Sequence, residues 1–333
     1  MPTANLYNTW IDEINKHSIG FEICLQNANG KIDKKNINQN TIVITTMGRN
    51  REHPLIYPWQ MVIIDECLTT QNRDSLQSEG AWKQIAISQY GTILLSASFF
   101  RSRFDKLFYM LKMLKSGIPE KREYLDTILN ECMVCNLVNS TRKWITTVTK
   151  FKLNNSIRKK YDQLNSNQKN KDYADLYVEL SKYLYDNVNY VEYFEEMINK
   201  IEKNDKNRKV LIYARSKNEA DNIAKKIKNV SRFPELGKQH TVLSYTEGTF
   251  GLNCLVVFDT ILTRPPYPDH VPQMCGRLDR PNQKAKLLYL EYVLIENTVE
   301  EGSLYRLEMA NNFYQQYIMP LAEFYKVAVT LKK

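Results

Sequence analysis

Short apolar segments alternate with helix-like stretches near both ends of the chain. Runs of strand length occupy residues 21–25, 42–45, 61–64, 93–95, 210–213, 256–258 and 287–292. An amphipathic helical pattern follows one of them at residues 217–228. Because strands buried inside a parallel sheet are continuously apolar, this alternation predicts an α/β fold with two sheet-forming regions, residues 1–118 and 206–333.

The middle of the chain, residues 119–205, loses this strand character except near residues 145–151. Apolar side chains there recur at helical spacing, in a stripe formed by Tyr173, Leu176, Leu180, Leu184 and Val188. Such a stripe is more typical of a packed core than of a ligand site. We therefore predict a helical linker or insertion over residues 119–205, with an exposed loop near residues 165–171.

Composition is that of a protein with a sizeable core. Of the 333 residues, 43% are hydrophobic and 25% are charged, which favours two domains. We expect neither a membrane span nor a signal peptide, since no run approaches eighteen apolar residues. Cys132 and Cys135 form one C-x-x-C pair, but Cys254 and Cys275 fall on predicted core elements, so reduced cysteines are expected rather than zinc. These features indicate an intracellular setting, cytoplasmic or nuclear.

The formal net charge of +9 and the pI near 9.0 favour a polyanionic partner. Residues 132–161 contain no acidic residue, and their aromatic residues Trp144, Phe151 and Tyr161 alternate with basic ones. Basic and aromatic side chains together can follow a phosphate backbone and stack on bases. This pattern predicts nucleic-acid contacts from Arg142, Lys143, Lys150 and Lys152, with a solvated lysine-rich face as the alternative.

Two carboxylates, Asp65 and Glu66, directly follow the apolar run 61–64. In parallel α/β sheets ligands bind at the carboxyl ends of the strands. One carboxylate there can hold Mg²⁺ through water, and its neighbour can accept a proton from water that attacks a γ-phosphate. The plain alternative is a polar end to a strand. The run near residue 93 similarly leads into the small hydroxyl residues Ser96 and Ser98, which can relay contacts between two ligands.

The segment 248–283 carries a second group of candidate residues. Gln273, Arg277 and Arg280 have one-turn helical spacing, so they are predicted to share a helix face and converge on one phosphate. A solvated basic helix is the alternative. Upstream, Gly248 and Gly251 allow a close approach of backbone to a phosphate.

These segments occur in the order of motifs II to VI of superfamily 2 helicases, and the chain resembles the Swi/Snf-like ATPase branch of that family. The resemblance rests on D-E at 65–66, S-A-S at 96–98, K-V-L-I-Y-A-R-S at 209–216, G-T-F-G-L-N at 248–253 and Q-M-C-G-R-L-D-R-P-N-Q at 273–283. Residues 2–14 are similar to motif Ia, and residues 41–46 to motif Ib. Abundant Asn, Lys, Ile and Tyr are also typical of AT-rich genomes, including those of large DNA viruses.

The resemblance implies two RecA-like lobes, ATP and Mg²⁺ as cofactors, and DNA or RNA as the partner. It implies that Asp65 coordinates Mg²⁺, that Glu66 is the catalytic base, and that Gly251 belongs to the nucleotide site. Gln273, Arg277 and Arg280 then reach the γ-phosphate from the second lobe. The nucleic-acid track, or its coupling to the cleft, is assigned to Thr45, Thr46, Ser98, Gly248 and Asn253.

The phosphate-gripping loop of the family, G-x-x-x-x-G-K-[ST], does not occur in these 333 residues. ATP binding by this chain is therefore expected to be weak, and the first lobe is expected to be incomplete at its amino terminus and less stable than the second. Two hypotheses follow. The chain is the motif Ia to VI portion of an ATP-dependent helicase or translocase, completed by a further segment or chain, or it is an inactive core that binds nucleic acid or a partner.

Overall fold

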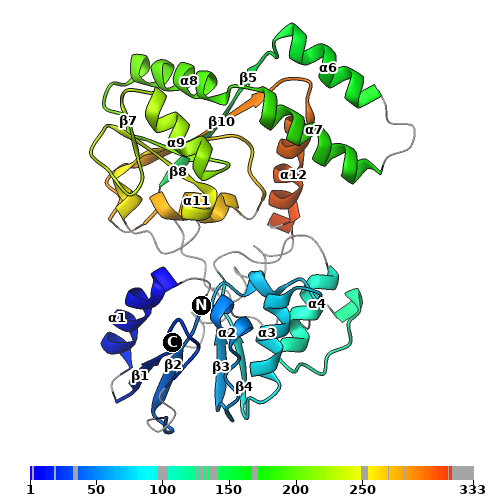
Figure 1. Cartoon of the computed structure of the whole chain (residues 1–333), viewed down its shortest axis with the longest axis vertical. Coiled ribbons are helices and arrows are strands. Elements are labelled where there is room, and N and C mark those ends of the chain that lie inside the picture. The colour runs from blue at the N-terminus through cyan, green and yellow to red at the C-terminus, as the bar shows by residue number, and fades with distance from the viewer. Residues whose placement is uncertain are drawn as a thin grey trace. The chain divides into compact units, whose positions relative to one another are not determined.

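The computed structural model describes residues 1, 4–18, 20–32, 37–96, 104–124, 127, 131–132, 134, 142–166, 172–248, 254–268, 270–280, 282–313 and 315–316. The chain divides into two compact units. Unit 1 comprises Met1–Leu137 and Phe313–Lys333, and unit 2 comprises Val138–Asn312 (Figure 1).

Unit 2 is built on a six-stranded parallel sheet. Its strand order is β5 (Lys143–Phe151), β10 (Leu287–Ile295), β9 (Thr260–Thr263), β6 (Val210–Ala214), β8 (His240–Ser244) and β7 (Val230–Arg232). Every residue of β6, β8 and β9 is buried, which explains the continuous apolar run in β6. The predicted α/β class with parallel sheets is confirmed.

Helices cover this sheet, and alternate residues of β6 enter different cores. Val210, Ile212 and Ala214 belong to one core cluster, whereas Leu211 and Tyr213 belong to another, as the two-residue period of a strand requires. The helices of the unit are α6 (Asn155–Ser166), α7 (Tyr173–Asn187), α8 (Tyr190–Asn204), α9 (Lys217–Lys226), α10 (Tyr245–Gly248), α11 (His270–Leu278) and α12 (Val299–Phe313).

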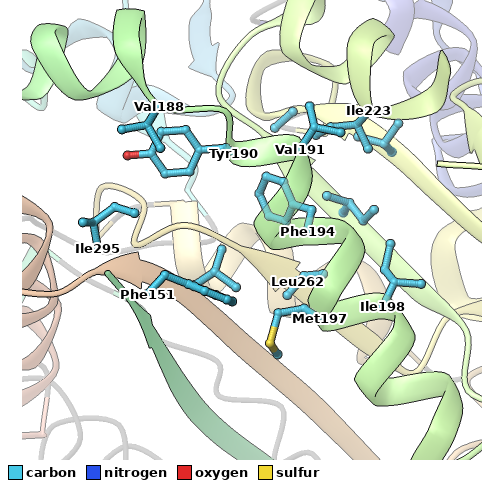
Figure 2. Close-up of a cluster of buried hydrophobic side chains, with 14 of the residues drawn as sticks. Phe151, Val188, Tyr190, Val191, Phe194, Met197, Ile198, Ile223, Leu262 and Ile295 are labelled. Atoms are coloured by element: carbon cyan, nitrogen blue, oxygen red, sulfur yellow. The ribbon is translucent and has the colours of Figure 1, made fainter. Parts of the chain in front are cut away.

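The first core cluster joins α7, α8 and α9 to the sheet (Figure 2). Phe194 and Ile198 of α8 are fully buried there beside Leu262 of β9. The predicted core stripe is confirmed for Leu176, Leu180, Leu184 and Val188, all of which are buried in this cluster.

Strand β5 is the edge strand of the sheet and pairs with β10 along all nine of its residues. Residues from 143 onward therefore pack as part of unit 2, because β5 and helices α6 to α8 share its first core. The structure has two compact units, and the division of the chain into residues 1–118, 119–205 and 206–333 stays a prediction.

Unit 1 contains two parallel strand pairs, β1 (Glu22–Leu25) with β2 (Thr41–Ile44), and β3 (Met61–Ile64) with β4 (Gly91–Leu94). Its helices and 3-10 turns are η1 (Ala4–Leu6), α1 (Tyr7–His17), α2 (Met47–Glu52), η3 (Cys67–Thr70), α3 (Leu76–Ile85), α4 (Phe104–Met113) and η4 (Arg122–Tyr124). Ile64 packs with Ile85 and Met113, so α3 and α4 cover one face of β3 and β4.

The opposite face of β3 and β4 is apolar and exposed. Ile63 and Ile93 are register partners and are 53% and 39% exposed, and Met61 and Leu95 are also exposed. Exposed apolar faces favour association with another surface, and the lower stability of the first lobe stays a prediction.

One predicted strand is wrong. Residues 254–257 form a 3-10 helix, η6 (Cys254–Val257), and the strand of this region is β9, which begins at Thr260. No helix in the described part of the chain is long and apolar enough to cross a membrane.

Candidate functional site

The two carboxylates of unit 1 lie directly after β3. Asp65 Oδ2 accepts a hydrogen bond from Trp10 Nε1 at 3.2 Å, and Asp65 Oδ1 accepts one from the Glu66 backbone N–H at 3.0 Å. Since each carboxylate oxygen has more than one lone pair, both bonds orient Asp65 and leave acceptor capacity for water or a metal ion. Sequence reasoning missed Trp10, whose only signal is its place in the segment similar to motif Ia.

Glu66 has a left-handed backbone conformation, with φ 50° and ψ 49°. This region costs a residue with a Cβ about 1–3 kcal/mol, and such residues cluster at functional sites. The turn directs the chain from β3 into η3 and brings Cys67 N–H to the Leu95 carbonyl at 2.9 Å. Burial, together with the negative charges of Glu66 and Asp65, raises the pKa of the Cys67 thiol to about 12. That thiol is therefore neutral beside the two carboxylates.

Thr45 and Thr46 follow β2, and both hydroxyl groups already have protein partners. Thr46 Oγ1 accepts a hydrogen bond from Arg49 N at 3.1 Å and so caps α2. Thr45 Oγ1 donates to Gln26 Oε1. Arg49 in turn donates to the Gln26 carbonyl at 2.7 Å and to the Tyr7 hydroxyl at 2.6 Å. These contacts give both threonines a local structural role, and their assignment to a nucleic-acid track stays a prediction.

In unit 2, α11 carries Gln273 and Arg277, whereas Arg280 lies beyond the helix end at Leu278. The prediction of one shared helix face is therefore wrong for Arg280. Arg277 Nε donates to the Gly248 carbonyl at 3.3 Å, which brings together two sequence-predicted residues. Burial, and next the positive charge of Arg277, lower the pKa of Arg280. The two guanidinium groups are thus near enough to repel, and an anion beside them would relieve that repulsion.

Among the residues that the structure describes, Tyr213 Oη and Gln273 Oε1 of the same region are buried and have no hydrogen-bond partner. Burial raises the pKa of Tyr213 far above its ordinary value, so the hydroxyl stays protonated. A buried unpaired polar group is costly, and such groups in native proteins often accompany a functional site.

Gly248 lies tightly against the strands that flank it. A Cβ built at this position would be 2.3 Å from Tyr213 Cε1 and 2.5 Å from Leu243 Cδ1. The missing side chain thus allows close packing of α10 on β6 and β8, and a positive φ is not the reason for this glycine.

We expect Gly248→Ala to destabilise unit 2 by about 1–3 kcal/mol, because overpacking moves the Tyr213 ring or the backbone. The matched control is Gly276→Ala, since no atom lies within 4 Å of a Cβ at that helical position. The stability of the Gly276→Ala variant should be unchanged or raised. Denaturant unfolding followed by circular dichroism would show this difference, and equal effects of the two variants would contradict the packing role.

The turn after α11 is tied to the edge strand. Asp279 accepts from Arg142 Nη1 at 2.8 Å and from Trp144 Nε1 at 3.2 Å, and Arg142 Nη2 donates to the Gln283 carbonyl at 3.0 Å. Arg142 and Asp279 are both largely buried. Arg142 therefore fixes the chain next to Arg280, a role that sequence reasoning did not foresee.

The three lysines that were predicted to contact nucleic acid lie in different settings. Lys150 pairs with Glu301 at 2.8 Å, while Lys143 and Lys152 are exposed. Phe151 and Tyr161 are buried in the first core, so the prediction that these two rings stack on bases is wrong. The apolar side of β5 and the packing face of α6 account for both rings.

Several predicted positions lie outside the described residues, namely Ser98, Gly251 and Asn253, together with Cys135 of the C-x-x-C pair. Among the residues that the structure does describe, no group of three or more His, Cys, Asp or Glu side chains is arranged to hold a metal ion. Asp65 and Glu66 belong to unit 1, and the arginines belong to unit 2.

No protein-family model matches the chain. Over its whole length the chain is 44% identical, across 335 aligned residues, to a protein of Acanthamoeba polyphaga mimivirus named "Putative helicase L115". The chain spans 26% of that protein, about a quarter of its length.

Proposed function

We propose that this chain is the motif Ia to VI portion of a superfamily 2 helicase or translocase of the Swi/Snf-like branch, which hydrolyses ATP and acts on DNA or RNA inside the infected cell. Similarity between the whole of this chain and about a quarter of a viral protein named "Putative helicase L115" supports this proposal. The order of the sequence motifs supports the finer assignment to the branch.

The observation that carries the proposal is the chemistry at the end of β3. Asp65 is oriented by Trp10 and by the Glu66 N–H, and Glu66 has a strained backbone at that turn. The carboxylate of Asp65 keeps the acceptor capacity that a water-coordinated Mg²⁺ needs, so it is the residue that would hold the ion. Bound Mg²⁺ supplies charge neutralisation on the phosphates. Glu66 then accepts the proton of the attacking water.

Arg277 and Arg280 supply the positive charge that phosphoryl transfer needs as charge develops on the γ-phosphate. The bond from Arg277 to the Gly248 carbonyl couples this arginine to the predicted nucleic-acid track. We propose that the phosphate-gripping loop comes from another segment or chain, since its pattern is absent here. Without such a segment or chain, the missing loop favours the second candidate, a core that binds nucleic acid or a partner without hydrolysing ATP.

Both candidate functions can be tested by measuring nucleic-acid binding, because a protein that uses this fold for another purpose is not expected to bind nucleic acid. We expect the double variant Lys143→Ala, Lys152→Ala to bind single strands more weakly, with a salt slope smaller by about 0.7 for each lost phosphate contact. Both side chains are exposed, so the fold should be unaffected. Fluorescence anisotropy over a range of salt concentrations measures affinity and slope together.

The control is Lys225→Ala, Lys226→Ala on α9, which removes the same charge from another exposed surface. If both double variants change the slope equally, only net charge matters and the stretch is a solvated face. If the unchanged protein binds no nucleic acid at all, the proposed function is wrong.

A further inference from the structure

Unit 2 contains a hollow of about 410 Å³ that the proposed ATP chemistry does not use. It lies where Arg215 follows the end of β6 and Arg264 follows the end of β9, and α7 and α12 supply further lining residues. Ligands of parallel α/β sheets bind at this end of the strands. Its volume is within the range of small-molecule and cofactor sites.

A column of aromatic rings leads from the core to this hollow. Tyr213 stacks on Tyr245 with ring centroids 5.9 Å apart, and Tyr245 stacks on His270 at 5.3 Å. His270 in turn lies 6.3 Å from Tyr267. Tyr213 is 1% exposed and Tyr267 is 61% exposed, so the column ends at an open aromatic face. Such a face accepts any nucleobase by stacking.

The loop that presents Tyr267 is restrained by its sequence. Pro265, Pro266 and Pro268 surround the tyrosine and also line the hollow. Proline fixes its own φ and restricts the residue before it, so this loop loses little freedom when a ligand binds. A large aromatic side chain is thus held at the surface by a stiff backbone.

Two arginines of the hollow stack on tyrosine rings. The guanidinium carbon of Arg306 lies 4.2 Å from the Tyr177 ring centroid, and that of Arg215 lies 5.2 Å from the Tyr185 centroid. Stacking positions a guanidinium group while its N–H edge stays available to an anion. Among the described residues, neither arginine forms an ion pair with a carboxylate.

Arg264 differs from these two. Its Nη2 lies 2.7 Å from both oxygens of Glu219, and its guanidinium carbon is 3.9 Å from the Tyr190 centroid. Glu300, the carboxylate among the described lining residues, accepts hydrogen bonds from the Tyr190 hydroxyl at 2.6 Å and from Ile295 N at 2.8 Å. Glu219 pairs with Arg264, and Glu300 interacts with both Arg264 and Arg215, so these two carboxylates face three arginines and the hollow keeps a net positive charge.

We propose that this hollow binds one nucleotide unit of a single-stranded nucleic acid, with its base stacked at Tyr267 and its phosphate at Arg215 and Arg306. The proposal rests on nucleic-acid binding in the proposed function and adds a site for it. A paired base cannot expose its face for stacking, so the site should select single strands over duplexes.

The test uses the whole 333-residue chain and a fluorescent twelve-nucleotide oligothymidine. We expect Tyr267→Ala and Arg306→Ala each to weaken binding about tenfold, from lost stacking and a lost charge-assisted hydrogen bond respectively. Lys225→Ala, which removes one charge from exposed α9, should change the affinity less than twofold. Duplex binding should be the same in all variants, and thermal unfolding should confirm that each is folded.

Thymidine monophosphate provides the second arm. If the free nucleotide binds the unchanged chain and not the variants, while strand binding is equal in all, the site takes a free nucleotide and the strand proposal is wrong. Equal strand binding in all variants without nucleotide binding overturns the site and leaves the proposed function standing. Failure of the unchanged chain to bind any strand overturns both.

Discussion

Changing Glu66 to Gln is expected to lower ATP hydrolysis by about 10²–10⁴-fold in a version of the protein joined to a segment carrying a G-x-x-x-x-G-K-[ST] loop. The amide keeps the shape of the side chain and removes its capacity to accept a proton from water. Nucleotide affinity should be nearly unchanged, since Asp65 remains in place. The 333-residue chain alone should hydrolyse ATP no faster than its own Glu66→Gln variant, because the loop that grips the phosphates is missing from it.

Steady-state phosphate release measures both comparisons. Glu79→Gln is the matched control, because Glu79 is an exposed residue of α3 in the same unit. Hydrolysis by the 333-residue chain that Glu66→Gln abolishes would show that no further loop is needed. Undiminished hydrolysis by the longer Glu66→Gln protein would remove Glu66 from the role of base.

Arg277→Ala is expected to reduce kcat by about 10³–10⁵-fold in the same longer protein, the range found for arginines that stabilise phosphoryl transfer. Arg277→Lys should recover only a small part of this loss, because lysine lacks the planar fork of donors. The effect should be in kcat rather than in KM, since an arginine that acts on developing charge contributes mainly in the transition state. Arg280→Ala should show the same pattern.

Lys284→Ala is a suitable control for charge, because Lys284 is exposed and lies only a few residues after Arg280. Each variant also needs an unfolding curve, since Arg277 bonds to the Gly248 carbonyl and its loss can loosen α10. A folded Arg277→Ala protein with normal kcat would show that this residue is a structural tether only.

The parts of the fold that were predictable are those with continuous apolar runs. Strands β3, β6 and β10 were located from sequence because each is a run of mostly apolar residues, although every residue of β6 is buried and β3 leaves Met61 and Ile63 exposed. Strand β8 was missed since His240, Thr241 and Ser244 are polar. Those side chains are buried with partners, as His240 Nδ1 accepts from Val210 N at 3.0 Å and its Nε2 lies 2.9 Å from Glu202 Oε1.

Strand β9 was misplaced for a related reason. Residues 255–258 are more apolar than Thr260–Thr263, but residues 255–257 lie in the 3-10 turn η6, and Leu255 and Phe258 pack into the second core. An apolar run indicates that a segment is buried, but it does not by itself indicate whether the backbone forms a strand or a helix. Only the pairing of β9 between β6 and β10 distinguishes the two segments, and pairing is a tertiary property.

The candidate site, like the fold, could be predicted only in part from local sequence. The positions of Asp65 at a strand end and of Arg277 on a helix follow from local pattern, and both were predicted. The hydrogen bond from Trp10 to Asp65 spans 55 positions, and the pair of Arg142 with Asp279 spans 137. Such contacts depend on how distant segments pack. Local sequence therefore predicted a nucleic-acid contact for Arg142 and did not predict that its guanidinium group holds the turn before Arg280.

The rate of ATP hydrolysis by the longer, loop-containing protein during titration with single-stranded nucleic acid tests the proposed ATP site best. We expect this rate to rise to saturation with the strand, and to fall to background in both Glu66→Gln and Arg277→Ala while strand binding persists. A rate that does not respond to the strand, or a stimulated rate that survives both substitutions, would contradict a helicase-type ATP site formed by these residues.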